Sequence, residues 1–214
     1  MVAELARDRM RAPDCWCRGR VARRLWVVLL LLFACLPAIA QPAVSSATDT
    51  RLLQVEGAFL VNFLRYTDWP PPRLGGTSDP YVVTVVGSPD AAEAVAAVAA
   101  AAGDIRGRRV QVRRASMATA ADRASAADVL RTSHLVFVQA SAQANVDTVL
   151  DTVRDLPILT VSDTPGFAAS GGMLGLVQSR AHLAFEANPA AIRNAGLMVS
   201  AKVLKLATLR GVQR

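Results

Sequence analysis

The residues of this chain best suited to hydrolytic chemistry are Ser162, Asp163 and the two histidines, His134 and His182. A nucleophilic serine needs a histidine base, and the histidine needs a carboxylate that orients it. Here Ser162 and Asp163 are neighbours in the sequence, and no Gly-x-Ser-x-Gly elbow presents a serine. The pattern therefore argues against a catalytic triad.

Metal and nucleotide ligands show no recognisable spacing either. The histidines form no i, i+3 or i+4 pair, and the three cysteines, Cys15, Cys17 and Cys35, all precede residue 40. The turn Gly87-Ser88-Pro89-Asp90 lacks the three spaced glycines of a dinucleotide fingerprint and the lysine of a phosphate loop. We expect no metal, no cofactor and no enzymatic activity.

Ser162 and Asp163 follow a short apolar run, 158–161, whose lack of polar alternation predicts a strand buried on both faces of a sheet. One interpretation is that their oxygens cap a helical turn that begins at Pro165. The other is that they line a ligand or partner crevice, because open α/β sheets bind ligands at the carboxyl ends of their strands. We favour the capping role, for which serine and aspartate are preferred on backbone grounds alone.

Other candidate residues lie at turns, corners and caps. Gly171 and Gly172 let the chain turn back before a second apolar run. Asn62 is the polar member of an apolar helix stripe, so we expect it to be buried and paired with a neighbouring loop. Trp69 is expected to be a packed corner rather than an exposed anchor. Seven residues are therefore candidates, first for fold integrity and second for partner binding: Asn62, Trp69, Ser162, Asp163, Gly171, Gly172 and Asn188.

Strand and helix patterns alternate along the chain, which predicts a mostly parallel sheet with helices on both faces. The expected fold class is α/β, a three-layer αβα sandwich. It ends in an antiparallel hairpin and a long C-terminal helix that Asn188 caps and that covers the sheet. The expected strands are 81–86, 109–115, 135–139, 158–161, 172–177 and 182–187, and the expected helices are 51–68, one that ends near 102, 120–131, 142–154 and the last one.

The N-terminus has the pattern of an export signal. A basic stretch, 18–24, precedes an apolar run, 25–36, and Ala38-Ile39-Ala40 supplies small residues for cleavage. The apolar run is shorter than the roughly 20 residues that cross a bilayer. We predict residues 1–40 as a signal peptide cleaved after Ala40, residues 41–50 as a flexible leader and residues 51–214 as one α/β domain.

The formal charge of +7 is concentrated in that signal. Residues 1–40 contain seven basic and three acidic side chains, so the rest of the chain carries +3. The basic cluster that remains, 106–114, has no interleaved aromatic residues such as a base-stacking surface requires. We expect no nucleic-acid partner.

Several short motifs, in this order, resemble those of the YfiR family. They are GAFLVNF at 57–63 leading to Trp69-Pro70, LTVSD at 159–163, GGM at 171–173, FEAN at 185–188 and GLMVSAKVLKLA at 196–207. The family consists of periplasmic α/β proteins without known catalysis. Its best-understood members hold an inner-membrane sensor diguanylate cyclase inactive by binding the periplasmic domain of that cyclase.

The resemblance implies a non-enzymatic periplasmic repressor that lowers cyclic di-GMP signalling. It implies the sensor domain as one partner, an outer-membrane lipoprotein that sequesters the repressor as another, and a homodimer as a further possibility. Redox sensing is not carried over, because residues 41–214 contain no cysteine. The alternative from another class is a periplasmic solute-binding module that serves a transporter or sensor kinase and uses the Ser162–Asp163 crevice.

Overall fold

Seven strands form the central sheet of the computed structural model, which describes residues 44–178 and 183–210. The first five strands of the order run parallel, β7 is antiparallel to β6, and β9 is parallel to β7. The α/β class and the mostly parallel sheet predicted from the sequence are thus confirmed. In spatial order the strands are β3 (Val110–Ala115), β2 (Tyr81–Val86), β4 (Leu135–Val138), β5 (Leu159–Ser162), β6 (Leu174–Gln178), β7 (Leu183–Ala187) and β9 (Thr208–Leu209).

Burial follows the place of each strand in the sheet. Every residue of β2, β4 and β5 is buried, as mostly apolar sequences without polar alternation on one face predict for strands covered on both faces. β3, at one edge, mixes exposed and buried positions. The central strands therefore form a rigid platform whose two ends carry the loops.

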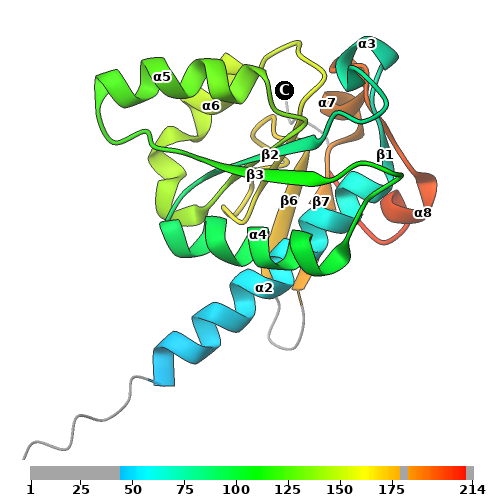
Figure 1. The fold of residues 1–214 in the computed structure, drawn as a ribbon. Helices are drawn as coiled ribbons and strands as arrows, with labels where there is room; N and C mark the ends of the chain where they lie inside the picture. Colours follow the sequence, from blue (N-terminus) through cyan, green and yellow to red (C-terminus); the bar gives the residue numbers. More distant parts are fainter. Residues whose placement is uncertain (1–43, 179–182, 211–214) are drawn as a thin grey trace, which may run out of the picture. The chain divides into compact units, whose positions relative to one another are not determined.

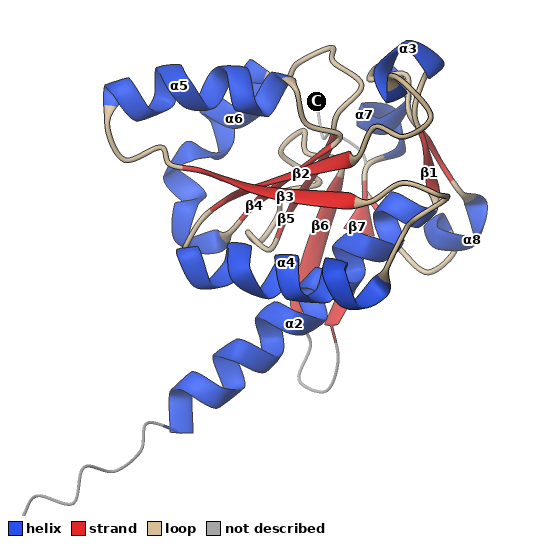
Figure 2. Ribbon diagram, in the orientation of Figure 1, coloured by secondary structure: helices blue, strands red, loops and turns tan. Residues whose placement is uncertain are grey.

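Helices cover both faces of this platform (Figures 1 and 2). α2 (Val44–Arg65) and α4 (Pro89–Ala102) pack together on one face, and α5 (Ala120–Arg131) and α6 (Val146–Thr152) lie on the other. A 3-10 helix, η1 (Ala140–Asn145), precedes α6, where the sequence predicted one continuous helix over 142–154.

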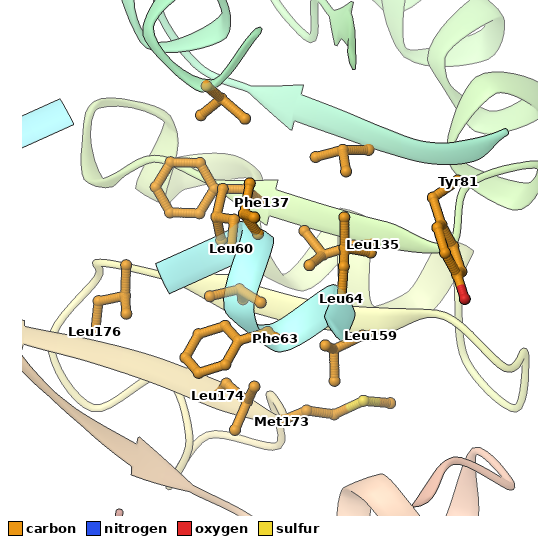
Figure 3. Packing of buried hydrophobic residues seen from close by; sticks show 14 of the residues in the cluster. Leu60, Phe63, Leu64, Tyr81, Leu135, Phe137, Leu159, Met173, Leu174 and Leu176 are labelled. Carbon is orange, nitrogen blue, oxygen red and sulfur yellow. The ribbon is translucent and has the colours of Figure 1, made fainter. Parts of the chain in front are cut away.

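Helix α2 is the element that seals the larger core. Figure 3 shows its Leu60, Phe63 and Leu64 among the apolar side chains of β4, β5 and β6. Phe63 also contacts Phe185 of β7, with ring centroids 5.2 Å apart. The helix begins at Val44, so residues 44–50, predicted as part of a flexible leader, are helical. No helix in the described ranges is long and apolar enough to span a membrane.

The predicted long C-terminal helix is wrong. α7 (Pro189–Asn194) ends after six residues, because Gly196 adopts φ +69° and the Leu197 and Gly196 N–H groups bond the carbonyls of Ile192 and Arg193. The chain then forms β8 (Met198–Val199), α8 (Ala201–Leu204) and β9, and β8 pairs antiparallel with β1 (Thr67–Asp68), which directly follows α2.

Other expectations from the sequence are corrected by the structure or concern residues that it does not describe. Residues 165–171 form turns, and no helix begins at Pro165. A short helix, α3 (Pro71–Leu74), was not foreseen in the proline-rich stretch after Trp69. The predicted signal peptide, 1–40, and His182 lie outside the described residues.

Candidate functional site at the carboxyl edge of the sheet

The loops that follow β2, β4 and β5 meet at the carboxyl edge of the sheet. The strand order reverses here, because the chain passes from β2 outward to β3 and then crosses back to β4 on the other side of β2. In open α/β sheets this switch point is the usual position of a ligand crevice. The side chains at this edge therefore decide whether the fold binds a ligand in the usual way.

Gln139 joins the loops after β2 and β4 at the switch point, beside a pocket of about 310 Å³ whose lining includes Gly87 and Ser88. Its Oε1 accepts hydrogen bonds from the Ser88 N–H at 2.8 Å and from Ser141 Oγ at 2.9 Å. A Cβ atom on Gly87 would lie 2.6 Å from Gln139 Cβ, so the glycine permits this close approach. Ser88 in turn caps α4, its Oγ accepting the Ala91 N–H at 3.2 Å. Sequence reasoning did not single out Gln139; a glycine directly after a buried strand was the available signal.

Ser162 and Asp163 hold backbone groups in place at this edge. Ser162 is completely buried, and its Oγ accepts the Thr164 N–H at 3.0 Å. Asp163 does not cap a helical turn at Pro165; its Oδ1 accepts the N–H of Ala140, the first residue of η1, at 2.6 Å and so ties the loop after β5 to the start of η1. Burial raises the pKa of Asp163, and this hydrogen bond opposes the shift.

Glu56 brings a second carboxyl group to the same place from α2. It is 2% exposed, and its Oε2 has no hydrogen-bond partner in the part of the chain that the structure describes. Burial raises the pKa of Glu56 to about 7, and the negative charge of Asp163 adds to the shift. Sequence reasoning missed this residue, although a carboxylate between the apolar residues of a helix was visible.

The Glu56–Asp163 pair is the most perturbed ionisable group at the carboxyl edge. Two buried carboxyl groups that repel each other favour a state in which one of them is protonated, so the pair can bind and release a proton near neutral pH. Perturbed ionisable groups in such positions are candidates for function, although structural pairs show the same shifts.

The opposite, amino edge of the sheet holds Trp69 and His134. Trp69 is 5% exposed, packs against the ring of Tyr81 at 5.5 Å between centroids, and donates from Nε1 to the His134 carbonyl at 3.2 Å. His134 Nδ1 accepts the Val82 N–H at 3.0 Å, which leaves its Nε2 to donate to the carbonyl of Arg73 at 3.2 Å. Burial lowers the pKa of His134.

This arrangement separates the residues considered for a triad. His134 lies just before the first residue of β4, and Ser162 is the last residue of the adjacent parallel strand β5. The length of a four-residue strand, roughly 13 Å, therefore lies between them. His134 uses both ring nitrogens for backbone contacts, so its role in the described structure is to fix the corner around Trp69.

Gly171, Gly172 and Asn188 gather around the loop that joins β5 to β6. Gly171 has φ +103°, a conformation that favours glycine, and a Cβ on Gly172 would lie 2.2 Å from the ring of Phe167. Asn188 is completely buried; its Nδ2 donates to the Ala168 carbonyl at 3.0 Å and its Oδ1 accepts the Ala191 N–H at 3.1 Å. It therefore clamps this loop onto the start of α7.

Asn62 differs from the other candidates. It is exposed on the outer face of α2, where it lines a shallow pocket of about 370 Å³ with Val55, Ala58 and Phe59, so the expectation of a buried amide is wrong. The structure thus brings Ser162 and Asp163 together at the carboxyl edge. Trp69 lies at the amino edge, the two glycines and Asn188 lie around the β5–β6 loop, and Asn62 stands apart.

Comparison with known proteins shows which family the sequence matches. A family model described as YfiR/HmsC-like matches residues 53–208. No curated protein matches the chain.

Two solved structures share the fold. A conserved domain protein from Vibrio cholerae O1 biovar El Tor is 13% identical with a TM-score of 0.54, over 74% of this chain and 60% of that one. The ABC domain from Streptococcus pneumonia in complex with L-Trp is 13% identical with a TM-score of 0.53, over 70% of this chain and 60% of that one. This chain thus spans 60% of the length of each, and at this identity the likeness concerns the fold alone.

Proposed function

The chain belongs to the YfiR/HmsC-like family, and from this premise we propose that it is a non-enzymatic periplasmic protein that inhibits an inner-membrane diguanylate cyclase. Inhibition would occur through binding to the periplasmic sensor domain of the cyclase, which lowers cyclic di-GMP signalling. The observation that carries the proposal is the match of the family model, which extends from α2 to β9.

The local chemistry of the candidate residues agrees with a binding protein. The polar groups of Ser162, Asp163 and Gln139 hold backbone N–H groups of neighbouring loops. Groups used in this way stabilise the platform and leave recognition to its surface.

Inhibition follows from unequal affinity for two states of the cyclase. A protein that binds the inactive state more tightly than the active state shifts the equilibrium by that difference in binding free energy and by no more. A difference of about 3 kcal/mol is enough for roughly a hundredfold shift.

Deletion of the gene tests the proposal in cells. We expect cyclic di-GMP and surface attachment to rise in the deletion strain, and expression of the full chain to reverse both. A version that lacks residues 1–40 should fold but leave the nucleotide level unchanged, because the sensor domain faces the periplasm. Repression by the leaderless protein, or an unchanged nucleotide level after deletion with the cyclase intact, would contradict the proposal.

The partner can be identified with the protein that is purified from the periplasm. A pull-down from a membrane extract should recover a protein with a periplasmic domain and a diguanylate cyclase domain. The same experiment reports on the two other proposed associations, with an outer-membrane lipoprotein and with a second copy of the chain. Recovery of a transporter permease instead would favour the alternative function.

That alternative is a periplasmic solute-binding module. The sequence placed its site at the Ser162–Asp163 crevice, but Ser162 is completely buried. The alternative is instead favoured by a different pocket, of about 300 Å³ between α6, the β5–β6 loop and α7, whose lining includes Thr160, Ser170 and Asn194. The structurally similar Streptococcus domain was solved with L-Trp bound, which makes amino acids the first solutes to test. Calorimetric titration with a panel of amino acids tests this function. Saturable binding that is abolished by a larger residue at position 191 would support it, and the absence of any heat of binding would rule it out.

A further inference from the structure

The C-terminal elements carry exposed apolar side chains that the regulatory proposal does not use. Met198 is 68%, Leu206 78% and Leu209 59% exposed, values high for apolar side chains of this size. Tyr66, 40% exposed, joins them: the register of β1 with β8 places Tyr66 and Met198 on the same face of that two-stranded ribbon.

The same segment is basic. From Ala187 to the end the sequence contains five basic residues and no acidic one. Within the described ranges the ion pairs include Arg210 with Glu186, but none involves Lys202 or Lys205. Two lysines with free ammonium groups therefore stand among the exposed apolar side chains.

Local geometry aligns these groups. Val203 of α8 is buried, whereas Lys202 on the same helical turn and Lys205 and Leu206 directly after it are exposed. β9 pairs with the last two residues of β7, and the N–H of Ser200, the N-cap of α8, donates to the carbonyl of Tyr66 at 2.8 Å, directly before β1. We call this set, Tyr66, Met198, Lys202, Lys205, Leu206 and Leu209, the C-terminal patch.

We propose that the C-terminal patch docks the protein on an anionic phospholipid surface. Lysines that alternate with leucines are poorly suited to a dry protein interface, whose centre is depleted of lysine. At a lipid surface both groups are satisfied at once, because the leucines enter the boundary of the acyl chains while the lysine ammonium groups extend to the phosphates. The chemistry recognised is thus a layer of negatively charged headgroups over hydrocarbon.

The inference does not depend on the regulatory function, and a vesicle assay tests it directly. Protein purified from the periplasm is sedimented with vesicles of phosphatidylcholine alone or of equal parts phosphatidylcholine and phosphatidylglycerol. We expect binding to the anionic vesicles that decreases as salt is raised, and at least about tenfold weaker binding to the neutral vesicles.

Charge and apolar variants separate the two contributions. Lys202→Glu with Lys205→Glu should reduce binding to anionic vesicles at least about tenfold, and Leu206→Ser with Leu209→Ser should weaken binding in a salt-independent way. The matched control is Arg109→Glu with Arg114→Glu, the same charge change at exposed positions flanking and within the opposite edge strand, β3. All six substituted side chains are exposed, so the melting temperatures should stay within a few degrees of the wild type.

Three outcomes would overturn the proposal. The first is no sedimentation of the wild type with anionic vesicles. The second is equal loss of binding in the Arg109 and Arg114 control. The third combines two results: the wild type does not sediment with vesicles, and the Lys202→Glu, Lys205→Glu variant loses regulatory activity in cells. This outcome would assign the C-terminal patch to an acidic protein partner.

Discussion

Glu56 of α2 is buried within range of the charge of Asp163, which directly follows β5: burial raises the pKa of Glu56 to about 7, and the negative charge of Asp163 adds to the shift. One oxygen of Glu56 has no hydrogen-bond partner within the described residues. The interface between α2 and the sheet therefore includes a carboxyl group, that of Glu56, whose charge changes near neutral pH.

The first prediction concerns stability against pH. The pKa of Glu56 is higher in the folded chain, about 7, than its ordinary value of 4.5, so between these values the folded state binds more protons than the unfolded state. Stability therefore falls as pH rises through this window, by up to about 3 kcal/mol, and this contribution is constant above it. Glu56→Gln should remove this loss of stability, so the free energy of unfolding of the variant, relative to the wild type, should increase from pH 5 to pH 8.

Urea unfolding at several pH values measures this difference. Comparison of variant with wild type is needed because His134 acts in the opposite direction: its pKa is lowered by burial, so it decreases stability as pH falls below its ordinary value. Glu93→Gln, the same change at an exposed position of α4, is the control and should show no pH-dependent advantage. A difference between Glu56→Gln and wild type that is the same at every pH would contradict the assignment.

The second prediction separates the hydrogen bond of Asp163 from its charge. Asp163→Ala leaves the Ala140 N–H without its acceptor and should lower the free energy of unfolding by about 1–2 kcal/mol. Asp163→Asn keeps an acceptor and removes the charge, so it should unfold close to the wild type. Because the Asp163 charge raises the pKa of Glu56, the pH-dependent loss attributed to Glu56 should become smaller and should end at a lower pH. Unchanged melting of Asp163→Ala together with lost partner binding would make Asp163 a contact residue instead.

The third prediction distinguishes the two adjacent glycines. Gly172 is required for space, because a Cβ would overlap the ring of Phe167, whereas Gly171 has open space and is required for its φ of +103°. Gly172→Ala should cost about 1–3 kcal/mol through overpacking, and Gly171→Ala about 1–2 kcal/mol through backbone strain. Adding Phe167→Leu should recover part of the loss for Gly172→Ala and none for Gly171→Ala. A double-mutant cycle with equal coupling for both glycines would refute this division.

The fourth prediction uses Trp69 as a probe. The sequence has three tryptophans, of which Trp69 alone lies within residues 41–214. Its indole is buried against Tyr81 and His134, so emission of the processed protein should shift to longer wavelength on unfolding. The shift should coincide with the loss of helical circular dichroism, because the Trp69 corner belongs to the same core as α2. A shift at clearly lower urea would show that the amino edge opens independently.

The sequence was sufficient to predict the central sheet. β2, β4 and β5 are short, largely apolar runs between turn residues, and runs of this length are typical of a strand that is covered on both faces. The helix N-cap at Asn188 could also be predicted, because Asn-Pro before an apolar stretch favours the start of a helix. These signals depend on neighbouring residues in the sequence, so they can be recognised without knowing which distant segments pack against them.

The features that the sequence did not predict depend on contacts between segments that are distant in the sequence. The spacing of Ile192, Ala195 and Val199 fits a helix, yet Val199 pairs with Thr67 of β1 and the helix ends before it. In α2 apolar residues lie on more than one side, so the period alone did not fix which side faces the sheet, and Asn62 was placed inward while Glu56 was overlooked. The hydrogen bond between Ser88 and Gln139 depends on the meeting of two loops, which no short-range pattern encodes.

The pairing of β1 with β8 has a consequence for how the chain acquires its structure. Thr67 and Val199 stand near opposite ends of the described domain, and α2 also rests on Phe185 of β7. Helix α2 thus gains its last contacts only when the final strands of the domain have been made. Because these contacts form late, α2 should remain accessible to chaperones or proteases until the C-terminal strands pair.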